Sequence, residues 1–279
     1  MYDIRKERNS GGRLLLGESR NPNGSLYNRG KMEIKILGIG GFINDGYAYN
    51  SFLLNGDFLI ETPPDIMQSL YRNEHDYKKI KRIFISHEHG DHIFGMPFIT
   101  LNLFKYYLTQ ELPSSKIEII GPRGIKERIY ELQVLATSPD NPSVEWMGNI
   151  YKFVEINEET EISLNKECEI NFFKTNHSKE TYGIKLKRNG ELIFVYTADT
   201  KWDEKYINVL KSKPKYCICD LNSNGDDSIK AHMSEKDITN YAIPVTGSET
   251  KYIGTHISKK RKSTNEFIEY AYDGAVYKI

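Results

Sequence analysis

The sequence predicts an α/β protein in which two β-sheets pack face to face between helices, as a four-layer αββα sandwich. Two observations support this fold class. Short apolar strands alternate with helical patterns through both halves of the chain, and each half has enough strands for its own sheet. The length of 279 residues and an apolar fraction of 39% are sufficient for one large domain with a substantial core.

The first half opens with residues 1–31, which are rich in Arg, Asn, Gly and Ser and predict a flexible N-terminal extension. From Met32, MEIKILGIGG predicts a strand that ends in glycines, and SFLLNGDFLIE predicts two strands joined at the Asn55–Gly56 turn. Asp65 is expected to cap a helix over 66–80, and RIFIS predicts a buried strand leading into HEHGDH. A helix over 93–108, the strand KIEII and a helix over 123–136 follow.

The second half repeats this alternation. Strands are predicted at YKFVEI, CEINFFKT, TYGIKLK, ELIFVYT and KYCICDL, with a helix over 203–213 before the last of them. A second helix begins at Ser234, and the short strands KYIGT and GAVYKI complete the chain. We expect residues 32–279 to form one compact domain.

Charge and apolar patterning exclude several classes of protein. The 38 basic and 38 acidic residues give zero formal net charge, so no global field attracts the chain to nucleic acid or membranes. The three cysteines are odd in number, and Cys217 and Cys219 would share one face of a strand, so no disulfide framework is expected. No run of about 18 apolar residues is present, and the polar start lacks the apolar centre of a secretory signal. We therefore expect a soluble cytoplasmic protein with no membrane partner.

The segment HEHGDH predicts a metal site. Three of the seven histidines lie between His87 and His92, and the pattern H-x-H-x-D-H supplies ligands that suit zinc, manganese or iron. His87 and His89 can face one centre while Asp91 and His92 face a second, so two metal ions are expected. The alternative interpretation is a solvated polar loop.

Further candidate ligands follow other apolar strands, and strand ends can bring distant residues to one edge of the sheets. They are His177 after INFFKT, Asp199 after LIFVYTA and His256 after KYIGT. Each residue alone is more often a turn residue or a cap, but all of them together with HEHGDH favour a dinuclear site.

The motifs HEHGDH, TNHS, YTADT and GTHIS, in this order after ILGIGG, resemble those of the metallo-β-lactamase superfamily from about Met32 onward. The resemblance implies the metallo-β-lactamase fold and a hydrolase domain over 32–279, with zinc as the expected metal and manganese or iron as alternatives. It implies one metal held by His87, His89 and His177, a second held by Asp91, His92 and His256, and a bridge between them at Asp199. Glu61 stands where many members have an aspartate, and we expect it to orient a ligand histidine rather than to bind metal.

The presence of His232 in KAHMSEKD indicates which branch of this superfamily the chain resembles. Phosphodiester hydrolysis expels an alkoxide, which requires a positioned acid, and the ribonuclease Z-like branch has a histidine at this place. We expect His232, together with Asp91, to be catalytic, with a metal-bridging hydroxide as the nucleophile. The alternative for His232 is a structural place beside a helix capped by Ser234.

Two substrates fit this branch. NHSKETYGIKL, YTADT, THIS and YDGAVYKI are similar to the small cyclic phosphodiesterases, which act on phosphoribosyl cyclic phosphate or cyclic nucleotides. Common bacterial ribonuclease Z has an arm for tRNA between the third-motif histidine and the bridging aspartate, and the 22 positions from His177 to Asp199 (199 − 177) leave no room for it. We therefore expect a small cyclic phosphodiester as substrate. The alternative is a tRNA 3′-processing endonuclease, which the GPRG turn favours. In that case the basic run Lys259–Lys262 could contact the phosphates of the tRNA.

Other activities stay open. A thioester or lactone hydrolase of the glyoxalase kind would use the metals without His232. A non-catalytic binding module is a further alternative, although such members generally lose ligands. The resemblance also implies a homodimer, because relatives are often dimers in which a partner's loop closes the pocket.

Overall fold

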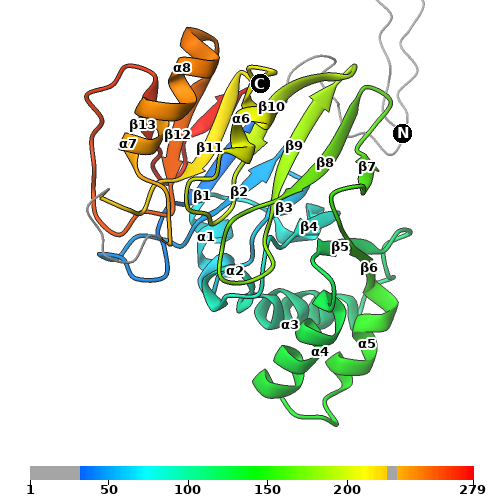
Figure 1. Cartoon of the computed structure of the whole chain (residues 1–279). Helices are drawn as coiled ribbons and strands as arrows, with labels where there is room; N and C mark the ends of the chain where they lie inside the picture. The colour runs from blue at the N-terminus through cyan, green and yellow to red at the C-terminus, as the bar shows by residue number, and fades with distance from the viewer. Residues whose placement is uncertain (1–31, 225–230) are drawn as a thin grey trace, which may run out of the picture. The chain divides into compact units, whose positions relative to one another are not determined.

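The computed structural model describes residues 32–224 and 231–279, so the N-terminal extension expected at 1–31 lies outside the described residues. Within the described part, the strands form two seven-stranded sheets (Figure 1). The first sheet has the order β14-β1-β2-β3-β4-β5-β6, and the second has the order β13-β12-β11-β10-β9-β8-β7. The predicted pair of sheets is therefore confirmed.

The strands of the first sheet are β1 (Glu33–Gly38), β2 (Ser51–Leu54), β3 (Phe58–Ile60), β4 (Arg82–Phe84), β5 (Ile117–Gly121), β6 (Tyr151–Glu155) and β14 (Val276–Lys278). Those of the second sheet are β7 (Glu161–Ser163), β8 (Cys168–Lys174), β9 (Tyr182–Arg188), β10 (Glu191–Tyr196), β11 (Tyr216–Asp220), β12 (Lys251–Thr255) and β13 (Ile268–Tyr270). Strands β3 to β6 run parallel, and so do β10 to β13. Parallel neighbours end at one edge of a sheet, which gathers the loops that follow them.

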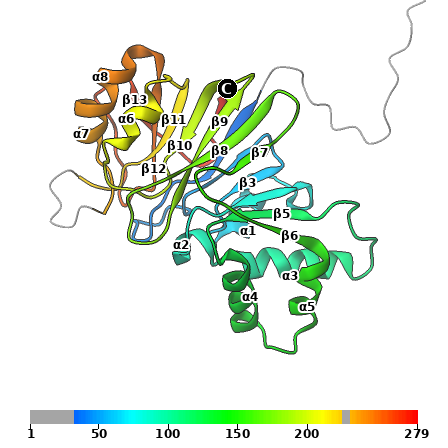
Figure 2. The ribbon, with the colours of Figure 1, turned by 45° about the vertical axis from the view of Figure 1, so that its right-hand side comes forward.

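Helices cover the outer face of each sheet, as the two views show (Figures 1 and 2). Those on the first sheet are α1 (Ile66–Arg72), η1 (Tyr77–Lys79), α2 (Gly90–Ile93), α3 (Met96–Tyr107), α4 (Ile125–Ala136) and α5 (Pro142–Ile150). Those on the second sheet are α6 (Lys205–Leu210), α7 (Glu235–Asp237), η2 (Ile238–Ala242), α8 (Ile243–Thr246) and η3 (Gly247–Glu249). None of the helices in the described ranges is long and apolar enough to cross a membrane.

Three apolar cores separate these four layers. Strand alternation sends Phe52 of β2 into the core between the sheets, while its neighbour Leu53 packs under the helices of the first sheet. Phe84 of β4 and Phe172 of β8 stack across the sheet interface at 5.6 Å between ring centroids. A third core lies between the second sheet and α6, η2 and α8. The four-layer αββα sandwich predicted from the sequence is confirmed.

Several local expectations change. The helix predicted over 66–80 ends at Arg72, and Asp65 forms no side-chain cap; its carboxylate accepts a hydrogen bond from the Tyr49 amide at 3.3 Å. The helix expected over 93–108 is divided into α2 and α3 at Gly95, whose backbone lies against the carbonyl of Pro63 too closely for a Cβ. Helix α5 and the short strands β7 and β13 were not predicted.

Other local expectations are confirmed. Asn55 and Gly56 both have positive φ, 52° and 73°, as the hairpin between β2 and β3 requires. Ser234 caps α7 through a reciprocal pair of hydrogen bonds with Asp237.

Candidate metal centre

Four strands deliver the predicted ligands to one place. HEHGDH follows β4 and begins α2, and the other predicted ligands follow β8, β10 and β12. The structure brings together all seven residues that the sequence predicted as ligands: His87, His89, Asp91, His92, His177, Asp199 and His256.

The first group contains three imidazoles. The Nε2 atom of His87 lies 2.9 Å from Nδ1 of His89, and Nε2 of His177 lies 3.1 Å from the same Nδ1. Two of these residues belong to the loop after β4, and the third belongs to the loop after β8 of the other sheet. Three nitrogens that converge in this way match the ligand set of a zinc-type site.

The second group combines carboxylates and imidazoles. Nε2 of His256 lies 3.1 Å from Oδ2 of Asp91, and Nε2 of His92 lies 3.5 Å from the same oxygen. All three side chains are buried. This group thus also draws on both sheets.

Asp199 lies between the two groups. Its Oδ2 atom lies 4.0 Å from Nε2 of both His87 and His177. Its Oδ1 atom lies 3.3 Å from Nε2 of His92, and Oδ2 lies 3.2 Å from Nε2 of His256. One carboxylate that faces both groups is the arrangement a bridging ligand needs.

The other ring nitrogen of each buried histidine faces an oxygen. Nδ1 of His87 lies 2.9 Å from the Ser86 hydroxyl. Nδ1 of His92 lies 3.4 Å from Oε2 of Glu61, which also accepts a hydrogen bond from the Ser86 amide at 3.1 Å. Glu61 therefore lies behind His92, as expected from the sequence. Such partners fix ring orientation and raise the basicity of ligand histidines.

The backbone is strained at three strand ends around the centre. Glu61, Ala198 and His256 have φ values of 65°, 52° and 58°, a region that residues other than glycine rarely adopt. Strain of this kind persists where surrounding contacts over-determine the conformation, and it concentrates at functional sites.

Asp220, at the end of β11, is a site residue that the sequence interpretation missed. Its Oδ2 atom lies 2.6 Å from Nδ1 of His232, and its Oδ1 atom lies 3.4 Å from Nδ1 of His256. The amide of Thr200 donates to Oδ2 at 3.0 Å, which holds the carboxylate in place. The strand-end rule that found Asp199 also applies to Asp220 in KYCICDL, so the signal was present.

His232 lies beside the metal groups. Its ring centroid is 5.1 Å from that of His256 and 5.8 Å from that of His177. Burial would lower the pKa of His232, but the Asp220 carboxylate outweighs burial and raises it. Nδ1 faces Asp220, which leaves Nε2 as the ring nitrogen that Asp220 does not engage.

The buried carboxylates of the centre favour the binding of cations. Burial keeps the pKa of His87 well below its ordinary value, whereas the Asp199 and Asp91 carboxylates overcome burial and raise the pKa of His92 well above it. Glu61, Asp91, Asp199 and Asp220 are all buried, and no lysine or arginine among the described residues forms an ion pair with any of them. Buried carboxylates at this density are stable only when paired or bound to metal.

Two buried atoms test the fit directly. Nε2 of His92 and Oδ1 of Asp199 face each other at 3.3 Å, yet neither has a hydrogen-bond partner within 32–224 and 231–279. A divalent cation could take the place of the proton on His92, since a neutral imidazole and a carboxylate oxygen would then both be free to bind it. The residues present therefore fit two divalent ions of the kind that accept imidazole and carboxylate ligands.

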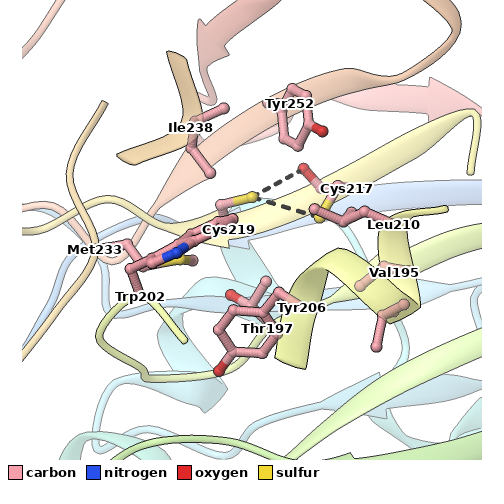
Figure 3. Close-up of a pocket in the computed structure, with 11 residues that line it drawn as sticks. Val195, Thr197, Trp202, Tyr206, Leu210, Cys217, Cys219, Met233, Ile238 and Tyr252 are labelled. Carbon is pink, nitrogen blue, oxygen red and sulfur yellow. Dashed lines mark hydrogen bonds between the residues drawn. The ribbon is translucent and has the colours of Figure 1, made fainter. Parts of the chain in front are cut away.

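An apolar pocket lies elsewhere, between the second sheet and helices α6 and η2 (Figure 3). Its walls include Cys217 and Cys219, whose Sγ atoms lie 3.4 Å apart on the same face of β11 without forming a disulfide. Its volume of about 10 Å³ is too small for an organic ligand. The pocket thus does not compete with the metal centre as a substrate site.

The fold is that of metallo-β-lactamase fold proteins, and the ligand groups are of a kind that could hold metal ions. The sequence profile of the family described as Anti-Pycsar protein Apyc1 matches residues 32–262. The chain belongs to this family.

Curated relatives include ribonuclease Z enzymes. The enzyme of Pediococcus pentosaceus is 33% identical over 119 residues, which cover 42% of this chain and 35% of that protein. The enzyme of Clostridium perfringens is 25% identical over 256 residues, which cover 70% of this chain and 77% of that protein. The alignments with the first three relatives cover 35%, 43% and 45% of their lengths, so the chain spans less than half of each.

Solved structures agree in fold. The metallo-β-lactamase fold protein YhfI of Bacillus subtilis has a TM-score of 0.67 at 18% identity, with 89% of this chain and 99% of that chain covered. The short form of human tRNase Z has a TM-score of 0.67 at 17% identity, with 88% and 98% covered. At these identities the likeness concerns the fold.

Proposed function

We propose that the protein is a dinuclear metal phosphodiesterase that hydrolyses a small cyclic phosphodiester, a cyclic nucleotide or a phosphoribosyl cyclic phosphate. The observation that carries the proposal is the Asp220–His232 pair beside the two ligand groups. A site that only opens a thioester or lactone has no need of such a pair, whereas phosphodiester cleavage must protonate an alkoxide.

The proposed roles follow from the geometry. His87, His89 and His177 would hold one divalent ion, Asp91, His92 and His256 the other, and Asp199 both, with zinc as the proposed metal and manganese or iron as alternatives. A bound metal pair supplies nucleophile activation and charge to balance the phosphate.

His232 would then deliver the proton to the leaving oxygen. Asp220 accepts from Nδ1 at 2.6 Å, which sets the tautomer and keeps Nε2 directed to exchange a proton. The raised pKa of His232 favours the protonated ring that this role requires. No side chain needs to form a covalent intermediate.

The preference for a small substrate rests on the segment between His177 and Asp199. Strands β9 and β10 occupy it and pair with each other, joined by a turn at Asn189–Gly190 with φ values of 50° and 82°. An arm for tRNA has no place in this hairpin. The site could then act on phosphodiesters small enough to enter between the strand-end loops.

The second candidate is a tRNA 3′-processing endonuclease. The curated relatives named ribonuclease Z favour it. The candidate would have to bind tRNA through a surface other than the β9–β10 hairpin.

One experiment separates these candidates. Metal content is measured on the purified full chain, which is then assayed on cyclic mononucleotides, cyclic dinucleotides, bis(nitrophenyl) phosphate and precursor tRNA. We expect about two metal ions per chain, the number that two ligand groups predict, and hydrolysis of a cyclic phosphodiester. Cleavage of precursor tRNA at its 3′ trailer without cyclic phosphodiester hydrolysis would instead support the endonuclease. Metal-loaded protein that cleaves no phosphodiester would contradict both.

A further inference from the structure

The basic run Lys259–Lys262 is divided by the structure. Three of its side chains, Lys259, Lys260 and Lys262, are exposed, while Arg261 is half-buried and turns towards β11. Arg261 forms no ion pair with any described residue. The hydrogen bonds that its guanidinium forms within the described residues go to neutral groups.

Those groups are three consecutive backbone carbonyls. Nη1 of Arg261 donates to the carbonyls of Leu221 and Ser223, both at 2.8 Å, and Nη2 donates to the carbonyl of Asn222 at 2.7 Å. Only a guanidinium presents several donors in one rigid plane, so a lysine ammonium cannot reproduce this pattern. We define residues 221–223 as the clasped segment.

The clasped segment connects the parts of the proposed acid. It directly follows Asp220, and the amide of Asn222 donates back to Oδ1 of that carboxylate at 3.2 Å. The amide of Ser223 donates to the carbonyl of Met233 at 3.0 Å, which ties the segment to the residue after His232. The clasped segment is thus hydrogen-bonded both to Asp220 and to the residue next to His232.

The same segment also touches the metal side of the centre. The amide of Leu221 donates to the carbonyl of Thr255 at 3.1 Å, and Thr255 directly precedes His256. A shift of the clasped segment would therefore alter how Asp220 meets both of its histidines.

We infer that Arg261 is a positioning residue for the Asp220–His232 acid: its guanidinium fixes the clasped segment and so sets the 2.6 Å contact through which His232 is oriented. This inference rests on the proposed phosphodiesterase function. It assigns Arg261 to the protein's own backbone rather than to a substrate phosphate, which was the role considered for the basic run.

The test compares Arg261→Lys with wild type on two diesters, one with an alkoxide leaving group and one with nitrophenoxide. Because misplacing a catalytic group by a fraction of an ångström slows its step, we expect turnover of the alkoxide diester to fall by about tenfold or more. The nitrophenyl diester needs no acid, so its turnover should fall by less than about threefold, with metal content unchanged. Lys260→Ala, which removes a charge from the same run, is the matched control and should behave as wild type on both diesters.

A double-mutant cycle with His232→Ala makes the test specific. If Arg261 acts through His232, the lysine substitution should have little further effect when His232 is absent. Guanidinium added at millimolar concentration should also restore activity to Arg261→Ala but not to His232→Ala, and this arm does not depend on the lysine variant. Each variant is assayed only if its circular dichroism spectrum matches that of the wild-type protein.

Three outcomes would overturn the inference. The first is that Arg261→Lys slows turnover of both diesters equally. The second is that the losses of activity from Arg261→Lys and His232→Ala add in the double variant. The third is that Lys260→Ala loses as much activity as Arg261→Lys. Each leaves the proposed function standing as long as wild type hydrolyses the diesters. Wild type that hydrolyses neither diester would instead contradict the proposed function.

Discussion

Asp220 links two parts of the centre at the scale of a single residue. One of its carboxylate oxygens faces the proposed acid His232 and the other faces the proposed ligand His256. Its burial is compensated by backbone amides, since Thr200 and Asn222 both donate to it. A carboxylate held so firmly can orient two imidazoles at once.

Replacing Asp220 with asparagine keeps the shape but removes the charge. The loss of the carboxylate lowers the pKa of His232 and weakens the bond to Nδ1, so fewer rings are protonated and aligned. We expect kcat for an alkoxide diester to fall by about 10- to 100-fold, less than the full effect of one general acid, because the imidazole itself remains. Steady-state kinetics and metal analysis check this. Glu118→Gln, at a half-exposed carboxylate of β5, is the control; an unchanged kcat in Asp220→Asn would contradict the role.

Removing His232 tests proton donation itself. The alanine variant should retain its metals, because none of the seven proposed ligands is altered. Turnover of alkoxide diesters should fall by about 10² to 10⁴-fold, while nitrophenyl diesters, whose leaving group is already stable, should lose far less. Parallel kinetics on the two substrates measure the ratio. Equal losses would show that His232 has a structural place instead.

At the scale of elements, strand ends were predictable and their contacts were not. Apolar runs followed by histidine or aspartate placed HEHGDH, Asp199 and His256 correctly at the ends of β4, β10 and β12. The pairing of Asp220 with His232 joins the end of β11 to a residue before α7, and only tertiary packing shows which of several strand-end carboxylates it reaches.

Helix boundaries also depend on tertiary contacts that the sequence pattern does not predict. The apolar pattern after Asp65 continues to Ile80, but the helix ends at Arg72 and Glu74 adopts a positive φ of 53°. Asn73, directly after the helix, bonds to distant residues instead: its side chain donates to Asp273 and its carbonyl accepts from Lys35. Helix α5 was missed, although Asn141 caps it and Pro142 occupies its first turn, a start signal readable in NPS.

Close packing between strands gives a prediction about Gly183 of β9. A Cβ atom there would lie 2.4 Å from Cζ of Phe173 and 2.6 Å from the carbonyl of Tyr196, so neighbours on both sides would have to move. We expect Gly183→Ala to lower the free energy of unfolding by about 1–3 kcal/mol, as overpacked cores do. Urea unfolding measures the change.

The matched control is Gly148 in α5. The nearest atom to a Cβ there is the Tyr130 hydroxyl at 3.7 Å, an ordinary contact. Gly148→Ala should leave stability unchanged or raise it by up to about 1 kcal/mol, because alanine favours a helix. Equal effects of the two substitutions would show that β9 can relax around the new methyl group.

At the scale of the whole described domain, the proposed metal centre joins the two sheets. Four of the seven proposed ligands lie in the loop and helix α2 that follow β4 of the first sheet, and the other three follow β8, β10 and β12 of the second. The sheets are otherwise held by the apolar core between them. Bound metals would therefore add a polar crosslink at the edge where that core ends.

Metal removal should consequently lower the stability of the whole domain as well as its activity. Chelation leaves buried carboxylates without cations, and a ligand at 100 to 1,000 times its Kd contributes about 2.7–4.1 kcal/mol to the folded state. We expect a chelator to lower Tm and abolish diester hydrolysis, with both restored by zinc or manganese. His232→Ala should keep this Tm response, because His232 donates a proton and holds no metal in the proposed scheme, whereas Asp199→Ala should lose most of it. A Tm that is indifferent to chelator in wild type shown to contain metal would mean that the ions bind outside the junction between the sheets.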